Sequence, residues 1–178
     1  MLKVYLTDLS AYNNGYLIGK WINLPLSEET LHMAINEVLC EGETAVGDKD
    51  HEEWFITDYE WDDLEFCEVG EYENIFELNA NMELLSGLDN DKLKSVAFLL
   101  NEGITVDISD AIQRSEDVTI HNNQDMEDVA YELLDECYGV HSLPSIVANN
   151  IDYERVAKDL EYDGTYWEIG DDVFKYIG

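Results

Sequence analysis

Acidic side chains form the clusters in this sequence that could do chemistry. Asp58, Glu60, Asp62 and Asp63 lie within six residues, and a pair of carboxylates is the catalytic set of many glycoside hydrolases. Such groupings are inevitable, however, where 41 of 178 residues are acidic. The four histidines are scattered, and the chain has no nucleophile motif such as GxSxG and no phosphate-binding glycine loop. We therefore predict that the protein is not an enzyme and has no catalytic residues.

Metal binding is the second chemistry that the residue types allow. The segment 48–53 (DKDHEE) contains carboxylate and imidazole ligands. It lacks the glycine and the spaced final glutamate of a calcium loop, and Lys49 lies inside it. The three cysteines are odd in number and show no CxxC spacing, so they indicate neither a disulfide framework nor a thiolate zinc site. We expect residues 41–53 to be a solvated acidic loop, and we expect no metal and no cofactor.

The charge of the whole chain restricts its partners. Only 9 basic residues oppose the 41 acidic ones, which gives a net charge of -32. Nucleic acids and anionic membranes attract lysine and arginine, so direct binding to either is not expected. Leu, Ile, Val and Phe make up about 28% of the residues, above the roughly 20% typical of disordered chains. There is no signal-peptide pattern and no apolar run of 18 residues. We expect a folded, cytoplasmic protein with an anionic surface.

The elements that must carry this surface follow from the hydrophobic pattern. Segments 2–9 and 16–23 predict an antiparallel pair of strands around the turn signal Asn14-Gly15. Ser27 should cap a helix that runs to about Cys40, and 54–59 predicts a third strand. The remaining segments follow in chain order: helices at 75–86 and 90–102, a short helix near 108–112, a strand at 117–121, helices at 124–138 and 151–161, and a hairpin of 165–169 with 173–177.

The fold class is therefore α+β, with short antiparallel sheets and helices at both ends of the chain and an all-helical middle. We expect three small units, 1–61, 62–103 and 104–178, with net charges of -9, -9 and -14. The charge thus coats every unit. In helix 124–138 the acids Asp128, Glu132 and Asp135 project opposite the apolar stripe, where like charges destabilise a helix by a few tenths of a kcal/mol per pair. Acids that repel one another, where acid–base pairs would stabilise the helix, indicate that the sequence was selected for a negative electrostatic field.

A negative field of this size has three interpretations. B-form DNA carries one charge per roughly 1.7 Å of its axis, so 32 net charges correspond to about 54 Å, or roughly 16 base pairs. Carboxylates can occupy an arginine fork much as phosphates do, so a DNA-binding protein could accept this surface in place of DNA. Salt adaptation and calcium buffering are the alternatives from other classes, and the charge alone leaves all three open.

Short motifs in a fixed order resemble the ArdA antirestriction proteins, which conjugative plasmids and transposons carry. The similar segments span nearly the whole chain. They are 4–9 with 12–15 and 19–21, 56–60, Asp128 to Glu132 with Asp135, Tyr138 and Gly139 in the antirestriction motif, and 150–153 with 159–160 and 164–165. Two features depart from the family pattern, since 41–53 is longer than expected and Leu133-Leu134 stand where an aromatic residue is common.

The resemblance implies an elongated homodimer joined through the C-terminal units. It also implies a mimic of bent B-form DNA that occupies the DNA-binding groove of type I restriction–modification enzymes and blocks restriction and modification. The implied partner surface is the methyltransferase core with its DNA-specificity subunit. We expect the contacts to be carboxylates on all three units: Asp58, Glu60, Asp62, Asp63, Glu65, Glu71, Glu73, Glu77, Asp128, Glu132, Asp135 and Glu136.

Overall fold

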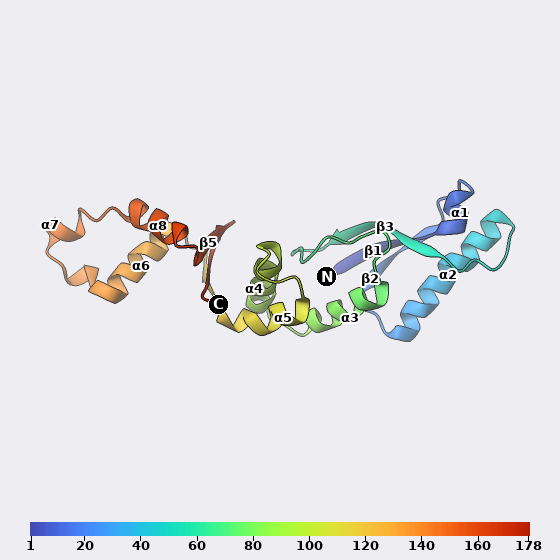
Figure 1. The fold of residues 1–178 in the computed structure, drawn as a ribbon, viewed down its shortest axis with the longest axis horizontal. Helices are drawn as coiled ribbons and strands as arrows, with labels where there is room; N and C mark the ends of the chain where they lie inside the picture. Colours follow the sequence, from blue (N-terminus) through green and yellow to red (C-terminus); the bar gives the residue numbers. More distant parts are fainter. The chain divides into compact units, whose positions relative to one another are not determined.

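Two compact units make up the chain, Met1–Ser109 and Asp110–Gly178 (Figure 1). The computed structural model describes all residues from Met1 to Gly178. Helices accompany two three-stranded antiparallel sheets, which confirms the predicted α+β class. The finer division at residues 61 and 103 stays a prediction. None of the helices has the length and hydrophobicity needed to cross a lipid bilayer.

The first sheet has the strand order β2-β1-β3. Its strands are β1 (Leu2–Asp8), β2 (Gly19–Leu24) and β3 (Trp54–Trp61), and both pairings are antiparallel. Leu2, Val4 and Leu6 alternate along β1 and are fully buried, as expected where one face of an antiparallel sheet covers a core. The predicted pairing of the two N-terminal strands is therefore confirmed.

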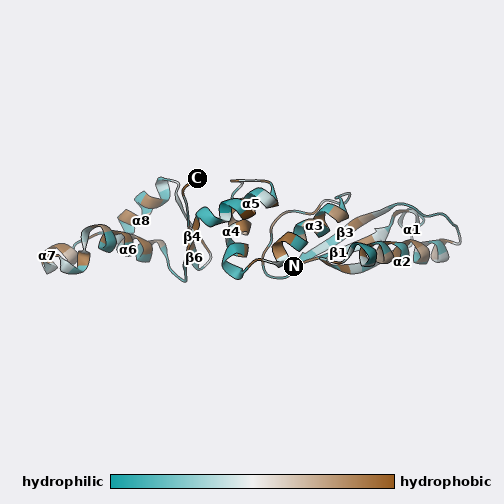
Figure 2. Cartoon of the chain, turned by 90° about the horizontal axis from the view of Figure 1, so that it is seen from below, coloured by the Kyte–Doolittle hydropathy of each residue, from teal (hydrophilic) through white to brown (hydrophobic).

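Two helices accompany this sheet. The five-residue helix α1 (Leu9–Asn13), which the sequence pattern did not predict, lies in the connection between β1 and β2. Helix α2 (Glu28–Val46) begins after Ser27, whose hydroxyl accepts a hydrogen bond from the Thr30 amide at 3.2 Å, so the predicted cap is confirmed. Its apolar residues face the core, and Figure 2 shows hydrophobic and hydrophilic residues interspersed along it.

The predicted loop at 41–53 is wrong in its first half. Helix α2 continues through it to Val46 and ends at Gly47. Gly42 lies in this extension, against Asp8 at the end of β1, and a Cβ atom there would overlap the Asp8 carboxylate. Glutamates favour the helical conformation, and the close contact at Gly42 fixes the extra turns against α1. Only residues 47–53 connect α2 to β3 without regular structure.

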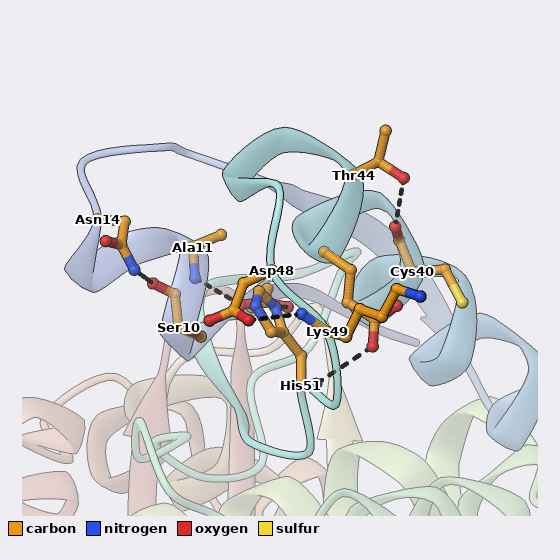
Figure 3. A network of polar contacts seen from close by, with 10 residues as sticks. Ser10, Ala11, Asn14, Cys40, Thr44, Asp48, Lys49 and His51 are labelled. Carbon is orange, nitrogen blue, oxygen red and sulfur yellow. Dashed lines mark hydrogen bonds and ion pairs between the residues drawn. The ribbon is translucent and has the colours of Figure 1, made fainter.

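A buried polar pair fastens this connection to the sheet. The Asp8 carboxylate is fully buried, accepts the Ala11 amide at 2.6 Å and lies 2.7 Å from Nδ1 of His51. The His51 side chain is 3% exposed, and its Nε2 atom is buried without a hydrogen-bond partner. The close-up in Figure 3 shows His51 and Ala11 converging on this point. His51 therefore belongs to the core rather than to a solvated loop.

Three helices follow β3 along the chain. Helix α3 (Ile75–Ser86), which has the predicted bounds, buries Ile75, Leu78, Met82 and Leu85. Helix α4 (Asn90–Asn101) is capped by Asp89, which accepts the Lys92 amide at 2.9 Å. Helix α5 (Ile108–Arg114) spans the division between the units and is followed by a 3-10 turn, Ser115–Asp117.

The second unit packs helices on a sheet of order β4-β6-β5. Its elements are β4 (Val118–Asn122), α6 (Met126–Tyr138), a 3-10 turn at Val140–Ser142, α7 (Ser145–Ala148), α8 (Tyr153–Tyr162), β5 (Tyr166–Ile169) and β6 (Asp172–Tyr176). Met126, Val129 and Ala130 of α6 form its core with Ala157, Tyr166 and Val173. The two helices predicted at 124–138 and 151–161 and the terminal hairpin are thereby confirmed.

Candidate protein-interaction surface

Nearly every acidic side chain lies on the surface. All are exposed except Asp8, which is buried, and Glu43, Asp110, Asp135 and Asp172, which are half-buried. Both units are strongly anionic. The first unit carries a net charge of -19 and the second one of -13. Eleven of the twelve predicted contact acids are exposed, and Asp135 is the exception. The surface therefore offers carboxylates throughout, with one buried acid reserved for the fold.

Strand β3 presents two predicted acids on the outer face of the first sheet. Asp58 pairs in register with Tyr5 and Glu60 with Lys3, and both acids are exposed. Tyr5 also pairs with Trp21, and the two rings meet edge to face at 5.3 Å between centroids. Alternate residues of a strand share a face, so Asp58 and Glu60 stand side by side next to this aromatic pair.

Asp62 is less available than its neighbours. Its carboxylate lies 3.0 Å from Nζ of Lys3 and 3.4 Å from the terminal amino group of Met1. The Lys3 hydrogen bond is the main cause that holds the pKa of Asp62 below its ordinary value, followed by the bond from the terminal amine. The same hydrogen bond raises the pKa of Lys3. Asp62 remains ionised, but its charge is largely matched within the protein.

The irregular segment that follows β3 carries the next group of acids. Two hydrogen bonds to its backbone hold it in place. The Ile56 amide donates to the carbonyl oxygen of Glu71 at 2.8 Å, and the Asn101 side chain donates to the carbonyl oxygen of Glu65 at 2.9 Å. The predicted carboxylates along it and in the first turn of α3 are all exposed: Asp63, Glu65, Glu71, Glu73 and Glu77. A fixed backbone thus displays these side chains to solvent.

Helix α6 displays the acids of the second unit. It begins at Met126, two residues later than predicted, because Asp125 caps it by accepting the Asp128 amide at 2.8 Å and Asn123 does not. Asn123 instead has a φ of 55° and donates its amide to the Asp172 carboxylate at 3.0 Å. The helix ends at Gly139 with a left-handed φ of 62°, after the 72%-exposed Tyr138. Both C-terminal motif residues therefore define the end of α6.

The acids of α6 differ in how far they are committed to internal bonds. Glu132 accepts a hydrogen bond from Gln124 at 2.6 Å and lies 3.8 Å from Nδ1 of His121. Asp128 and Glu136 are exposed, and their carboxylates meet no side-chain partner. Of the four predicted contact acids on α6, these two are consequently the most available to another protein.

Asp135 is tied to the turn beyond the helix. One of its oxygens accepts both the His141 amide at 2.9 Å and Nδ1 of His141 at 2.7 Å. The backbone hydrogen bond is the main cause that holds the pKa of Asp135 below its ordinary value, and the imidazole bond is the second. This carboxylate therefore has a positioning role in addition to any contact it makes.

The pH dependence of this contact has a definite sign. Because the pKa of Asp135 is lowered in the folded state, its carboxylate stabilises the protein at neutral pH, and this contribution is lost as pH falls through the lowered pKa. We expect a carbon-13 NMR titration to place the pKa of Asp135 below the ordinary value of an aspartate. In His141→Ala the pKa should rise only in part, since the backbone bond remains. An ordinary titration in the unsubstituted chain would contradict this geometry.

Three acids that the sequence analysis did not select lie next to Asp128. Asp125, Glu168 and Asp171 line a shallow hollow of about 350 Å³ with it, where the start of α6 meets the β5–β6 turn. The Glu168 carboxylate accepts the Met126 amide at 3.2 Å, at the positive end of the helix dipole. The available signal was the turn Gly170-Asp171-Asp172, but its proximity to α6 depends on the pairing of β4 with β6.

The surface as a whole is suited to ionic contacts with cationic groups. No three or more histidine, cysteine, aspartate or glutamate side chains are grouped so as to hold a metal ion. The exposed carboxylates instead form rows on separate elements, β3, the segment 62–74 and α6. Charge-assisted hydrogen bonds to arginine and lysine are what such rows can make.

Comparison with known protein families shows to which family this chain belongs. The family model described as antirestriction protein (ArdA) matches residues 4–175, nearly the whole chain. The chain belongs to the ArdA antirestriction family. Among curated proteins, none gives a significant match. Membership in the ArdA family implies an antirestriction function, which is the inhibition of restriction enzymes.

Proposed function

We propose that this protein inhibits type I restriction–modification enzymes by mimicking B-form DNA. Its carboxylates occupy the groove that the methyltransferase core and the DNA-specificity subunit form around DNA, and they exclude the duplex without any chemical step. Modification is inhibited together with restriction, because both use the same groove. The protein acts as a homodimer joined through the C-terminal units, which doubles the length of charge that it presents.

The exposure of the acids is the observation that carries this proposal. A groove that binds DNA presents lysine and arginine toward phosphates, and a ligand for it must offer anions that are free to exchange partners. The acids on β3, on the segment 62–74 and on α6 meet this requirement, because most of them lack an internal cation. Asp62 and Asp135, the two with lowered pKa values, are the least suited to such exchange.

Helix α6 supports the proposal through an arrangement that its own stability does not explain. Asp135 and Glu136 lie in its last turn, and no basic residue does. The helix dipole favours cations at this end, by about 0.3–1 kcal/mol for each exposed group. Glu132 and Glu136 are also four residues apart, a spacing at which like charges repel. A sequence selected for an anionic surface tolerates both costs.

Reversing one charge at this end should separate stability from inhibition. We expect Glu136→Lys to raise the free energy of unfolding by about 0.5 kcal/mol, because it relieves the repulsion and complements the dipole. The same substitution should weaken inhibition, since it places a cation in the carboxylate row. Urea unfolding followed by circular dichroism measures the first effect, and competition with DNA measures the second.

The matched control is Glu127→Lys, in the first turn of the same helix. It makes an identical change in net charge but places the cation at the positive end of the dipole, so it should be destabilising. If both variants gain the same stability, relief of the overall self-repulsion explains the effect, and the argument from the helix end is wrong.

Competition for a purified type I methyltransferase tests the proposed function directly. A fluorescent duplex carrying the recognition sequence is bound to the enzyme, and this protein is added in increasing amounts. We expect stoichiometric displacement, with an apparent affinity that falls steeply between 50 and about 200 mM salt, the range over which phosphate-binding proteins lose most of their affinity. Light scattering on the same samples reports the homodimer.

Folding across the same salt series separates the proposal from salt adaptation. A salt-adapted protein unfolds near 0.1 M salt because its acids repel one another, whereas a mimic must be folded there. A protein that is folded and dimeric at low salt and yet displaces no duplex would overturn DNA mimicry for this class of enzyme. Displacement that does not depend on salt would contradict the ionic mechanism.

A further inference from the structure

A groove in the first unit combines an apolar wall with carboxylates. It has a volume of about 720 Å³ and lies between the start of α2 and the length of α3, elements that can be followed in Figure 1. Leu31 and Phe76 line it, and so do Glu28 and Glu83, but no lysine or arginine does. None of the twelve acids predicted from the sequence belongs to it.

The walls of this groove are joined before any partner arrives. The Asn79 side chain on α3 accepts the Leu26 amide at 2.7 Å and donates to the Leu26 carbonyl oxygen at 2.9 Å. Asn79 is 8% exposed, so this paired contact is shielded from water. The groove is consequently preformed, and binding in it does not require the two segments to be brought together.

The apolar wall suits the stem and the head of an arginine side chain. Leu31 is fully buried beneath the groove, while the Phe76 ring is 37% exposed at its side. The ring of His32 lies 5.0 Å from that of Phe76 and orients it. Arginine stems cover apolar surface, and a guanidinium group stacks favourably on an aromatic ring.

The electrostatic field in the groove also favours a cation. Glu28 is 85% exposed in its side chain and lies 3.9 Å from the imidazole of His32, and the Glu83 carboxylate is exposed without a partner. The last turn of α3, which ends at Ser86, contributes the negative end of its dipole. The opposing positive end of α2 is capped by Ser27, which accepts the Thr30 amide.

We propose that this groove is an arginine-binding pocket, occupied by one arginine side chain from the DNA-binding surface of the inhibited enzyme. The stem packs on Phe76, above the buried Leu31, and the guanidinium group lies between Glu28 and Glu83. This inference rests on the proposed function, since that function supplies the arginine-bearing partner. It adds one anchored contact to an interface that otherwise consists of many weak and exchangeable ones.

The test uses a probe that needs no restriction enzyme. The peptide acetyl-Gly-Arg-Gly-amide is titrated into the nitrogen-15-labelled full chain, with acetyl-Gly-Lys-Gly-amide as the comparison. We expect saturable shifts at the amides of residues 28–31 and 76–83, stronger with arginine than with lysine. Glu28→Gln/Glu83→Gln and Phe76→Ala should each weaken the arginine peptide about fivefold. The spectra themselves report whether each variant is folded.

Glu52→Gln/Glu53→Gln is the charge-matched control, because both acids are exposed in the same unit and lie outside the groove. Shifts spread over all acidic segments, or equal weakening by the control pair, would overturn the arginine pocket. Duplex competition with the same variants then separates the two proposals. Strong displacement by a chain that fails to bind the peptide would leave DNA mimicry standing and remove the pocket alone.

Discussion

Neutralising four carboxylates of the first unit together is expected to weaken binding to a type I methyltransferase by about 30-fold. The variant is Asp58→Asn/Glu60→Gln/Asp63→Asn/Glu65→Gln, which leaves Asp62 in its ion pairs with Lys3 and the terminal amine. An exposed ionic contact is worth about 0.2–1 kcal/mol, so four of them account for a loss of this size. Duplex competition measures the change.

The effects of the single and the combined substitutions distinguish a distributed contact surface from a single binding site. Each of the four single substitutions should cost less than about fivefold, and the losses should accumulate as substitutions are combined. The salt dependence of binding should become shallower with every acid removed, because fewer ionic contacts are formed. A single substitution that abolished inhibition in a folded protein would show that the carboxylates do not act as an exchangeable set.

The control for this variant has the same net charge, because four acids are neutralised elsewhere on the first unit. Its four acids are exposed and lie outside the rows on β3 and the following segment: Glu29, Glu52, Glu53 and Glu102. Their conversion to glutamine should weaken binding only by the loss of long-range attraction, which salt screens within about 10 Å. An equal loss in the control would mean that net charge alone sets the affinity, and no defined contact surface would be needed.

The sequence predicted those elements whose residues repeat with a clear period. Helix α3 is the plainest example, since Ile75, Leu78, Met82 and Leu85 are all buried and the helix stops just before Gly87. The five-residue helix α1 is too short to show any period. It forms because Asp8 caps it, and Asp8 is held by His51, which is 43 residues away along the chain.

Long-range pairing separates the site residues that can be predicted from the sequence from those that cannot. Exposure of the acids on α6 follows from the periodicity of its own residues, so Asp128 and Glu136 could be selected from the sequence. The position of Glu168 against the start of α6 could not, because it depends on β6 pairing with both β4 and β5. The groove between α2 and α3 depends likewise on Asn79 reaching Leu26, 53 residues away.

The buried contact between Asp8 and His51 gives the second large prediction. We expect Asp8→Ala and His51→Ala each to lower the free energy of unfolding by about 3 kcal/mol, because each leaves a buried polar partner without its bond. Gly42→Ala should cost a similar amount, since its Cβ would overlap the Asp8 carboxylate. Thermal unfolding of the full chain should show midpoints lowered by about 6–12 °C.

A double-mutant cycle separates the pair from the cost of each truncation. Asp8→Ala/His51→Ala removes both partners, so its loss should be smaller than the sum of the two single losses by about 1–3 kcal/mol. His32→Ala provides the control, because that histidine is 57% exposed at the start of α2. Strictly additive losses would show that Asp8 and His51 stabilise the protein independently, against the 2.7 Å contact.

Inhibition should respond to these substitutions in the opposite way to the surface variants. Asp8 is fully buried and can meet no cation of a partner, so removing its carboxylate should leave duplex competition unchanged at a temperature where the variant is folded. Asp58 and Glu60, by contrast, are expected to contribute to binding and not to the stability of the fold. A loss of affinity in folded Asp8→Ala would mean that the α2–β3 connection positions the contact surface. Unchanged affinity would separate the one fully buried acid from the many exposed acids available for recognition.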